Sequence, residues 1–247
     1  MTKLSVNLNK IALLRNQRNI GIPSITESAK TVIEAGASGI TVHPRPDERH
    51  IRYTDVYELS ELLGRNYADI EFNIEGNPFT GKYMEIVPQV KPNQATLVPD
   101  APGASTSDHG WNLQADKDRL IPVIKQLKDS GIRVSLFMDP DVAGIKLAKD
   151  VGADRVELYT EPYARAFRTN QKPDEVLERY VTAAEAAADF GLGLNAGHDL
   201  NLENLGKFCS AVPALLEVSI GHALIADAIE MGLYNAVKEY LKILAQT

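Results

Sequence analysis

Residues 39–50 carry six charged or titratable side chains at the end of a short apolar run. The run is formed by Ile40, Thr41 and Val42, β-branched residues that are typical of a buried strand. Pro44 and Pro46 end that strand, because proline cannot donate to a central ladder. The titratable residues are His43, Arg45, Asp47, Glu48, Arg49 and His50. The segment is therefore either a solvated charged loop or a strand end that delivers catalytic groups.

The other strand ends favour the second interpretation. Each of the 5 histidines follows an expected strand; they are His43, His50, His109, His198 and His222. A single histidine is more often a structural hydrogen-bonding residue than a catalyst. Five histidines placed at random would rarely all lie at one end of a fold. Because histidine titrates near neutral pH, this distribution indicates an enzyme with an acid–base site.

Two carboxylates belong to the same pattern. Glu75 ends the third expected strand, and the side-chain period of two places it on the face of Asn73. Glu157 lies inside the sixth strand, between Val156 and Leu158. A carboxylate inside a barrel has a raised pKa unless it is paired, which suits acid–base catalysis. For Glu157, an ion pair with an inner basic residue is the alternative.

The seventh and eighth strands end alike, in Asn195-Ala-Gly-His198 and Ser219-Ile-Gly-His222. Glycine lets a phosphate approach the backbone, and free N–H groups at a helix N-terminus bind anions. These two loops form the frequent phosphate site of a (β/α)8 barrel. Lys10, which follows the first strand, could form a Schiff base, but its arginine-flanked position favours a phosphate contact. We therefore expect phosphorylated small-molecule substrates.

Strands and helices alternate along the chain, which predicts parallel strands joined by crossover helices. The expected strands cover residues 4–9, 38–43, 70–75, 95–99, 133–139, 155–160, 193–196 and 216–220. The expected helices cover residues 26–35, 54–63, 83–90, 116–130, 140–151, 173–190, 201–209 and 222–231, with a last amphipathic segment at 234–245. Eight such units favour an α/β fold, one TIM (β/α)8 barrel domain over residues 1–247. An open doubly wound sheet is the alternative, although its usual glycine-rich first turn is missing.

The composition limits the class of protein. The chain has 44% hydrophobic residues and a net charge of −7, which argues against nucleic-acid or anionic-membrane partners. The single cysteine, Cys209, excludes an intrachain disulfide and fits a reducing compartment. The early polar residues and the lack of a long apolar run predict a cytoplasmic protein. No metal-ligand spacing, Walker loop or nucleophile elbow occurs, so neither metal nor cofactor is expected.

At these residues the sequence resembles the pyridoxine 5′-phosphate synthase family, of the deoxyxylulose-phosphate-dependent route to vitamin B6. The resemblance covers essentially the whole chain. It is specific because many motifs occur in one order: Val6-Asn-Leu-Asn-Lys-Ile-Ala-Leu-Leu-Arg-Asn, Gly39-Ile-Thr-Val-His-Pro-Arg-Pro-Asp-Glu-Arg-His-Ile, Asn73-Ile-Glu, Leu97-Val-Pro, Val134-Ser-Leu-Phe, Val156-Glu-Leu, Asn195-Ala-Gly-His and Ile220-Gly-His-Ala.

The resemblance implies a reaction and a set of residue roles. The family is a TIM barrel with extra helices that forms a homo-octamer. It condenses 1-deoxy-D-xylulose 5-phosphate with 3-amino-2-oxopropyl phosphate to pyridoxine 5′-phosphate, inorganic phosphate and water. The implied catalytic residues are the bases His43 and Glu75, the acid His198 and the transition-state stabiliser Glu157. The implied substrate contacts are Asn7, Arg18, Gly221 and His222 for the aminoketone phosphate, Asn9, Lys10, Arg45, His50 and Thr106 for deoxyxylulose phosphate, and the backbone at Asp199.

Three places depart from the family's pattern. Asn9-Lys10 stands where the pattern has Asp-His, and Lys10 cannot change its charge near neutral pH. Asp199 stands in place of a glycine. The loop 100–112, a candidate lid rich in Pro, Gly, Ser and Thr, differs most, and no role is assigned to His109 or Trp111. The alternatives to the synthase are another phosphate-binding barrel enzyme, an isomerase or aldolase, and a non-catalytic barrel that binds pyridoxine phosphate.

Overall fold

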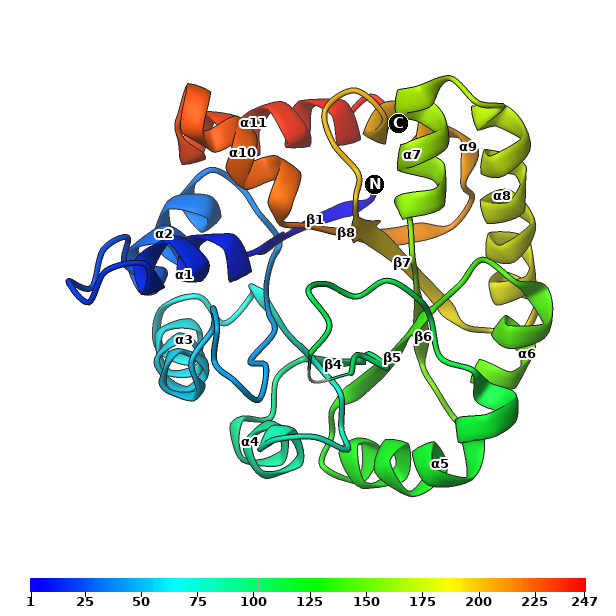
Figure 1. The fold of residues 1–247 in the computed structure, drawn as a ribbon, viewed down its shortest axis with the longest axis horizontal. Coiled ribbons are helices and arrows are strands. Elements are labelled where there is room, and N and C mark those ends of the chain that lie inside the picture. The colour runs from blue at the N-terminus through cyan, green and yellow to red at the C-terminus, as the bar shows by residue number, and fades with distance from the viewer. Residues whose placement is uncertain (102) are drawn as a thin grey trace.

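The computed structural model describes residues 1–101 and 103–247, and its strands form one closed parallel barrel (Figure 1). Each strand pairs with the next, and the last strand pairs with the first. The strands are β1 Lys3–Asn7, β2 Gly39–Val42, β3 Glu71–Gly76, β4 Gln94–Leu97, β5 Arg133–Met138, β6 Arg155–Leu158, β7 Gly193–His198 and β8 Leu215–Ile220. The expected TIM barrel is therefore confirmed, and the doubly wound sheet is excluded.

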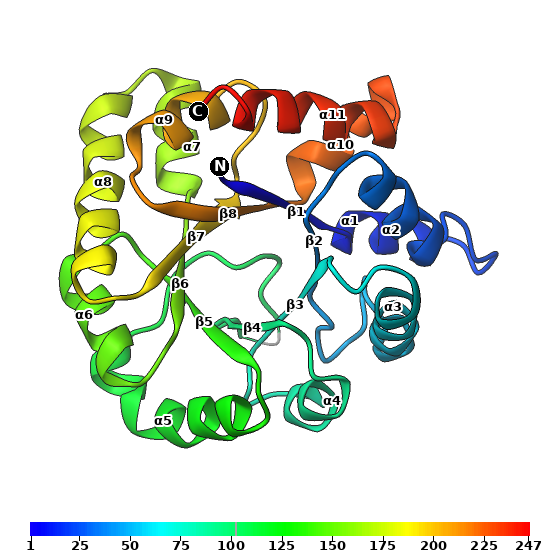
Figure 2. The same cartoon turned by 180° about the vertical axis from the view of Figure 1, so that it is seen from behind.

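The helices surround the barrel, as both faces show (Figures 1 and 2). In the described part of the chain they are α1 Asn9–Asn16, α2 Ile25–Glu34, α3 Tyr53–Asn66, α4 Tyr83–Val90, α5 Leu113–Asp129, α6 Val142–Asp150, α7 Glu161–Thr169, α8 Pro173–Asp189, α9 Leu205–Ala211, α10 His222–Met231 and α11 Leu233–Leu244. Within that same part, no helix is long and apolar enough to cross a bilayer.

Two of these helices were not expected from the sequence. The first strand was expected to run to Asn9, but it ends at Asn7 and α1 begins at Asn9. Helix α7 starts with Pro162 in its first turn, where the missing N–H of proline has no cost. The sequence pair Glu161-Pro162 is thus a helix-start signal.

The strands alternate between an apolar outer face and a polar inner face. In β3, Phe72 and Ile74 belong to the hydrophobic core, whereas Asn73 faces its neighbours across the lumen. The side chain of Asn73 donates to Thr41 Oγ1 at 3.3 Å and accepts from Thr96 Oγ1 at 3.0 Å. The helices pack on the apolar face, so the hydrophobic core lies between the barrel and its helices. The lumen is consequently polar although it is buried.

The amino end of the lumen holds a group of half-buried charges. Arg133 pairs with Glu71 and donates from Nε to Gln94 Oε1 at 2.9 Å. Arg155 donates to Asn195 Oδ1 at 3.2 Å. Burial lowers the pKa of Arg133 to about 10, with a further contribution from the nearby Arg155. These pairs give the charged groups at this end of the barrel local partners, as buried charges require.

Helix α1 is joined to α3 by a buried ion pair between Arg15 and Asp55. Arg15 donates from Nη2 to Asp55 Oδ2 at 2.9 Å and to the carbonyl of His50 at 3.1 Å. The side chain of Asn16 donates to the same carbonyl at 2.8 Å. Arg15 is therefore engaged in holding the backbone near His50, on the side of the barrel where β2 ends.

We expect Arg15→Ala to lower the free energy of unfolding by about 3–5 kcal/mol, because Asp55 would keep a buried charge without its cation. Urea unfolding followed by circular dichroism measures this. The matched control is Arg65→Ala, which removes an exposed pair with Glu61 one turn away and should cost less than about 1 kcal/mol. Equal losses in both variants would contradict the role of the buried pair.

Candidate active site

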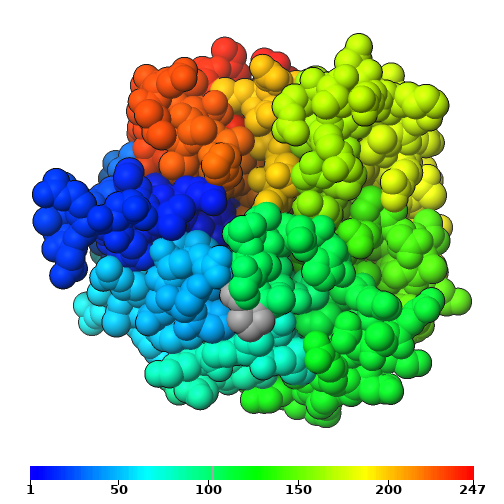
Figure 3. Space-filling view, in the orientation of Figure 1, coloured from blue at the N-terminus to red at the C-terminus, as the bar shows by residue number. Residues whose placement is uncertain are grey.

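The carboxyl ends of the strands surround a cavity of about 530 Å³, a size suited to a small-molecule site. Figure 3 views the molecule from this side, with the green segment after β4 lying over the centre. Thirteen of the fourteen site residues expected from the sequence line the cavity: Asn7, Asn9, Lys10, His43, Arg45, His50, Glu75, Thr106, Glu157, His198, Asp199, Gly221 and His222.

Arg18 is the exception. It is exposed and lies in the segment between α1 and α2, which projects from the edge of the barrel in Figure 1. It does not line the cavity. A contact between Arg18 and a substrate in this cavity would need a movement of that segment or a site on another subunit.

Glu75 and His43 lie side by side at the ends of β3 and β2. The distance from His43 Nδ1 to Glu75 Oε2 is 3.8 Å, and Asn7 donates to the same oxygen at 3.3 Å. Burial raises the pKa of Glu75 to about 7, with Asp100 adding to the rise. Burial also lowers the pKa of His43 well below its usual value. At neutral pH, His43 is therefore uncharged, and its contact with Glu75 is not an ion pair.

His198 has the opposite environment at the end of β7. Its Nδ1 lies 2.7 Å from Asp199 Oδ2, and its Nε2 lies 2.8 Å from Thr106 Oγ1. Burial lowers its pKa, but the hydrogen bond and charge of Asp199 outweigh burial, and Glu75 adds to them. The net pKa is raised, so His198 holds its proton at higher pH than an ordinary histidine. His198 is suited to act as an acid where His43 is suited to act as a base.

Glu157 forms the floor of the cavity, on β6. Only 3% of it is exposed, and burial raises its pKa well above the usual range, with Glu75 and Glu217 adding to the rise. Its Oε2 has no hydrogen-bond partner among the described residues. No ion pair with a basic residue forms within that part of the chain, so the structure does not support the alternative of a paired carboxylate. A carboxyl group with a raised pKa keeps its proton to a higher pH than usual, and in that form it can donate a hydrogen bond.

The segment between β4 and α5 lies over the mouth of the cavity and is anchored by Asp100. Asp100 pairs with Arg45 and accepts from Ser107 Oγ at 2.8 Å. Arg45 also donates to the carbonyl of Ala104 at 2.9 Å. Thr106 reaches the cavity from this segment. Pro102 belongs to the expected lid and lies outside the described residues.

The structure also places the two residues of this segment that had no assigned role. His109 is exposed, does not line the cavity and bonds to the adjacent Asp108. Trp111 is buried, and its Nε1 donates to the carbonyl of Leu97 at 2.9 Å. Its ring packs edge-on against Phe79. Trp111 therefore fixes the end of the segment to β4, and His109 lies on its outer side.

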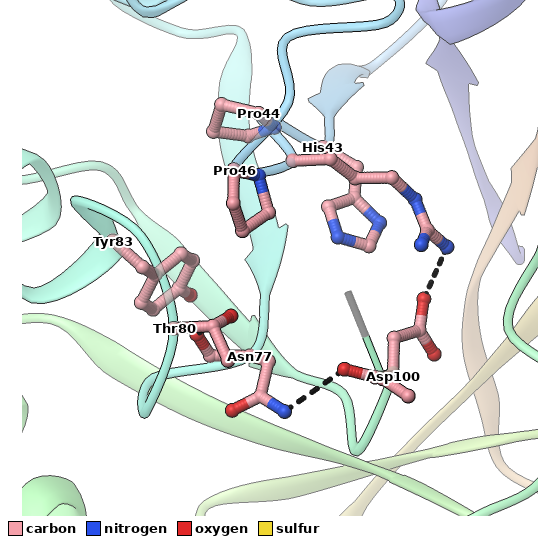
Figure 4. Close-up of a pocket in the computed structure, with 9 residues that line it drawn as sticks. His43, Pro44, Pro46, Asn77, Thr80, Tyr83 and Asp100 are labelled. Carbon is pink, nitrogen blue, oxygen red and sulfur yellow. Dashed lines mark hydrogen bonds and ion pairs between the residues drawn. The ribbon is translucent and has the colours of Figure 1, made fainter. Parts of the chain in front are cut away.

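A second, much smaller cavity of about 10 Å³ lies between His43, Asn77 and Asp100 (Figure 4). Its lining includes His43, Asn77 and Asp100, and the dashed lines in Figure 4 mark the bonds made by Asp100. The Oδ1 atom of Asp100 is buried and has no protein partner in the described ranges. A space of this size accommodates one water molecule, which could satisfy that oxygen.

The anion-binding candidates gather on the other side of the cavity. Helix α10 begins at His222, directly after Gly221, where a Cβ would come within 3.1 Å of the Asn7 side chain. Burial lowers the pKa of His50 to about 4, with Arg45 and Lys10 contributing. The Nδ1 of His50 accepts from the Ile51 N–H at 2.9 Å, so the neutral ring carries its proton on Nε2. His50 is thus a neutral donor, and Lys10 is a cation of this wall.

Sequence reasoning missed one wall of the cavity. This wall is formed by α7 and the segment between β7 and α9, with the lining residues Glu161, Ala164, Phe167, Arg168, Asn201, Glu203 and Asn204. Helix α7 was not expected, and residues 201–204 form a loop although the sequence was expected to be helical over 201–209; α9 begins only at Leu205. The start signal at Glu161-Pro162 would have revealed α7, but its orientation toward the cavity depends on the closed barrel.

The comparisons with known proteins agree with this geometry. The model of the family described as "Pyridoxal phosphate biosynthesis protein PdxJ" matches residues 4–246. The chain belongs to this family. Two relatives named pyridoxine 5′-phosphate synthase are 56% identical, from Albidiferax ferrireducens, and 50% identical, from Mesorhizobium japonicum. The matches cover 99% of this chain and 98% of the first relative, and 97% of this chain and 97% of the second.

Solved structures add information about the fold alone. Phosphoribosyl anthranilate isomerase from Thermotoga maritima matches with a TM-score of 0.61, over 100% of both chains, at 14% identity. At this identity the match shows that this PdxJ family member shares the barrel architecture of that isomerase. It carries no information about the reaction, because unrelated chemistries occur on the same barrel.

The raised pKa of Glu75 predicts a pH-dependent stability. Its folded-state pKa lies at about 7, above the usual 4.5, so ionisation destabilises the folded state increasingly as the pH rises from about 4.5 to 7. We expect Glu75→Gln to be more stable than the wild type at pH 8, by up to about 3 kcal/mol. At pH 4 the difference should vanish.

Urea unfolding at both pH values measures the effect. The control is Glu58→Gln, which neutralises an exposed carboxylate on α3. In this variant the free energy of unfolding should change between pH 4 and pH 8 as it does in the wild type. A Glu75→Gln variant with the same pH dependence as the wild type would show that Glu75 has an ordinary pKa.

Proposed function

We propose that this chain acts as a pyridoxine 5′-phosphate synthase. It would condense 1-deoxy-D-xylulose 5-phosphate with 3-amino-2-oxopropyl phosphate and release pyridoxine 5′-phosphate, inorganic phosphate and water. The observation that carries the proposal is the opposite protonation of His43 and His198 in one cavity, together with membership of the PdxJ family. A condensation that forms a ring needs a base and an acid at the same pH.

The bases in this proposal are Glu75 and His43. An amine must be uncharged to attack a ketone, and a carboxylate whose pKa is about 7 both accepts and returns a proton near neutral pH. His43 is uncharged and lies beside Glu75, so one of its ring nitrogens is able to accept a proton. Burial and the nearby Arg45 lower the pKa of His43, which keeps the ring uncharged and able to accept a proton.

The acid in this proposal is His198, and Glu157 stabilises the transition state. Phosphate and water both leave more easily when an acid protonates the departing oxygen. His198 is protonated at a higher pH than an ordinary histidine, which suits this donation. Glu157, held neutral by burial, would donate a hydrogen bond to an oxygen that gains negative charge during the reaction.

Two phosphate sites follow from the cations and helix ends of the cavity. Lys10, Arg45 and His50 would hold deoxyxylulose phosphate, with Asn9 and Thr106. Gly221 and His222, at the start of α10, would hold the aminoketone phosphate together with Asn7. Arg18 would join them from a neighbouring subunit of the oligomer proposed here, because within one chain it lies outside the cavity. Asp199 would contact substrate through its backbone, although its N–H already donates to Thr160 Oγ1 at 3.2 Å. We further propose a homo-octamer in the cytoplasm, without nucleic-acid, membrane, metal or cofactor partners.

An aldolase that works through a Schiff base is the second candidate within enzymes. Lys10 is the one lysine among the described residues that line the cavity. The end of β6 carries Thr160 and Glu161 in place of a lysine. Borohydride reduction in the presence of a phosphorylated ketone would trap a Schiff base on Lys10 in an aldolase and leave the synthase unmodified.

The decisive experiment is an incubation of purified protein with both phosphorylated substrates. Pyridoxine 5′-phosphate is measured by its absorbance and by mass spectrometry, and released phosphate by a coupled assay. Equal amounts of both products support the proposed reaction. Tight binding of pyridoxine phosphate without turnover would instead show a non-catalytic binding barrel.

We expect Glu75→Gln and His198→Ala to lower kcat by about 10²–10⁴, the usual contribution of one acid or base. Both variants should still bind inorganic phosphate, because neither residue is a proposed phosphate ligand. Steady-state kinetics and isothermal titration calorimetry measure the two properties. His109→Ala is the matched control, because this exposed histidine lies outside the cavity and should leave kcat unchanged. Normal rates in both site variants would refute the assigned roles.

A further inference from the structure

The contact between His198 and Asp199 fixes the tautomer of the histidine. The Nδ1 and Oδ2 atoms are 2.7 Å apart, which is a short hydrogen-bond distance. A carboxylate only accepts, so Nδ1 must carry a proton. The second nitrogen, Nε2, is then the one whose proton can be exchanged, and it lies on the side of Thr106 and the cavity.

Asp199 is itself held in place. Its N–H donates to Thr160 Oγ1, and that hydroxyl donates to the carbonyl of Gly197 at 2.8 Å. The Leu200 N–H donates to the same carbonyl at 2.8 Å. A side chain at Gly197 would overlap the backbone of Ser219 on β8, so this turn is packed closely against its neighbouring strand. The carboxylate therefore meets His198 from a turn with little freedom to move.

We propose that Asp199 is a positioning residue for the reaction, which holds His198 in the tautomer whose Nε2 faces the cavity and stabilises the ring when it is protonated. This role rests on the proposed function, in which His198 is the acid. It goes beyond the backbone contact proposed for Asp199, because it acts through the side chain and through His198, not on the substrate.

Other titratable groups also face His198 and have to be compared with Asp199. They are Glu75 from β3, Asp100 from the segment after β4, His43 from the end of β2 and Tyr159 from the end of β6. Asp199 is bonded directly to the ring, whereas Glu75 and Asp100 act by charge alone. Burial opposes all three carboxylates, because it lowers the pKa of His198. Removal of the Asp199 charge should therefore leave the effect of burial less opposed, and the pKa of His198 should fall.

The proton balance follows from this arrangement. In the acid step, Nε2–H gives its proton to the leaving oxygen, and the electron pair left on Nε2 makes the ring neutral. Nδ1–H stays bonded to Asp199 throughout, so the ring keeps its orientation. Water returns a proton to Nε2 before the next turnover. Without Asp199, the neutral ring could instead keep its proton on Nε2 and rotate.

The test uses the full-length protein with Asp199→Asn, which removes the charge, and Asp199→Glu, which keeps it. The ring of His198 is followed by ¹⁵N–¹H NMR as a function of pH without substrate, with His198→Ala to assign its signals. We expect a lower titration midpoint in Asp199→Asn and a midpoint closer to the wild type in Asp199→Glu. Asp150→Asn, an exposed carboxylate at the end of α6, is the control for loss of one negative charge and should leave the midpoint unchanged.

The same variants are then compared in turnover between pH 6 and pH 9. We expect kcat of Asp199→Asn to fall about tenfold or more at pH 8 and less at pH 6, because the acid loses its proton at a lower pH. KM should change little, since Asp199 does not hold substrate through its side chain. A purely structural role would lower kcat equally at all pH values, and thermal unfolding would show it as lost stability.

Either of two results would overturn the proposal, and each refutes a different part of it. An unchanged His198 titration or an unchanged pH profile in Asp199→Asn refutes the role of Asp199 and leaves the proposed reaction intact. Full turnover in His198→Ala refutes the acid assignment itself, and with it any role of Asp199 in positioning an acid.

Discussion

The closed parallel barrel directs every second strand residue into a buried lumen, and in this chain that lumen is polar. The helices cover the apolar outer face of the barrel, so the polar side chains of the strands lie on the inner face, in the lumen. Neighbouring strands satisfy most of these groups, as Asn73 does between Thr41 and Thr96. Glu75 and Glu157 lie at the carboxyl end of this lumen, where water is scarce and charge is costly. Their raised pKa values follow directly from that position.

The same cavity separates its histidines by their surroundings. His43 and His50 are buried near Arg45, and both effects lower their pKa. His198 is half-buried at the end of β7, and a bonded carboxylate raises its pKa against the effect of burial. Three copies of one residue type thus differ in pKa within one cavity, because the pKa of two is lowered and that of the third is raised. Acid and base chemistry at neutral pH needs such a difference between like groups.

The segment over the cavity uses a cation that the proposed reaction also needs. Arg45 is paired with Asp100 and bonded to Ala104, which are both part of this segment. A substrate phosphate near Arg45 would compete with Asp100 for the guanidinium. If Arg45 holds the substrate phosphate as proposed, binding and the position of the segment are coupled through this one side chain. Thr106 contributes a second link, because it reaches from the segment to His198.

The sequence by itself determined the barrel, most of its helices and the end of the barrel that carries the chemistry. The alternation of strands with helices is a local pattern, and parallel strands of one barrel must all end on one side. It could not show that Arg15 is buried against Asp55, while Arg18 projects into solvent, since both are arginines in one short stretch. Nor could it show that α7 forms a wall of the cavity. These facts depend on which residues meet across the closed barrel, and sequence distance does not measure such contacts. The bond between Asp199 and His198 joins neighbours in the chain, yet only the packed turn aims the carboxylate at Nδ1.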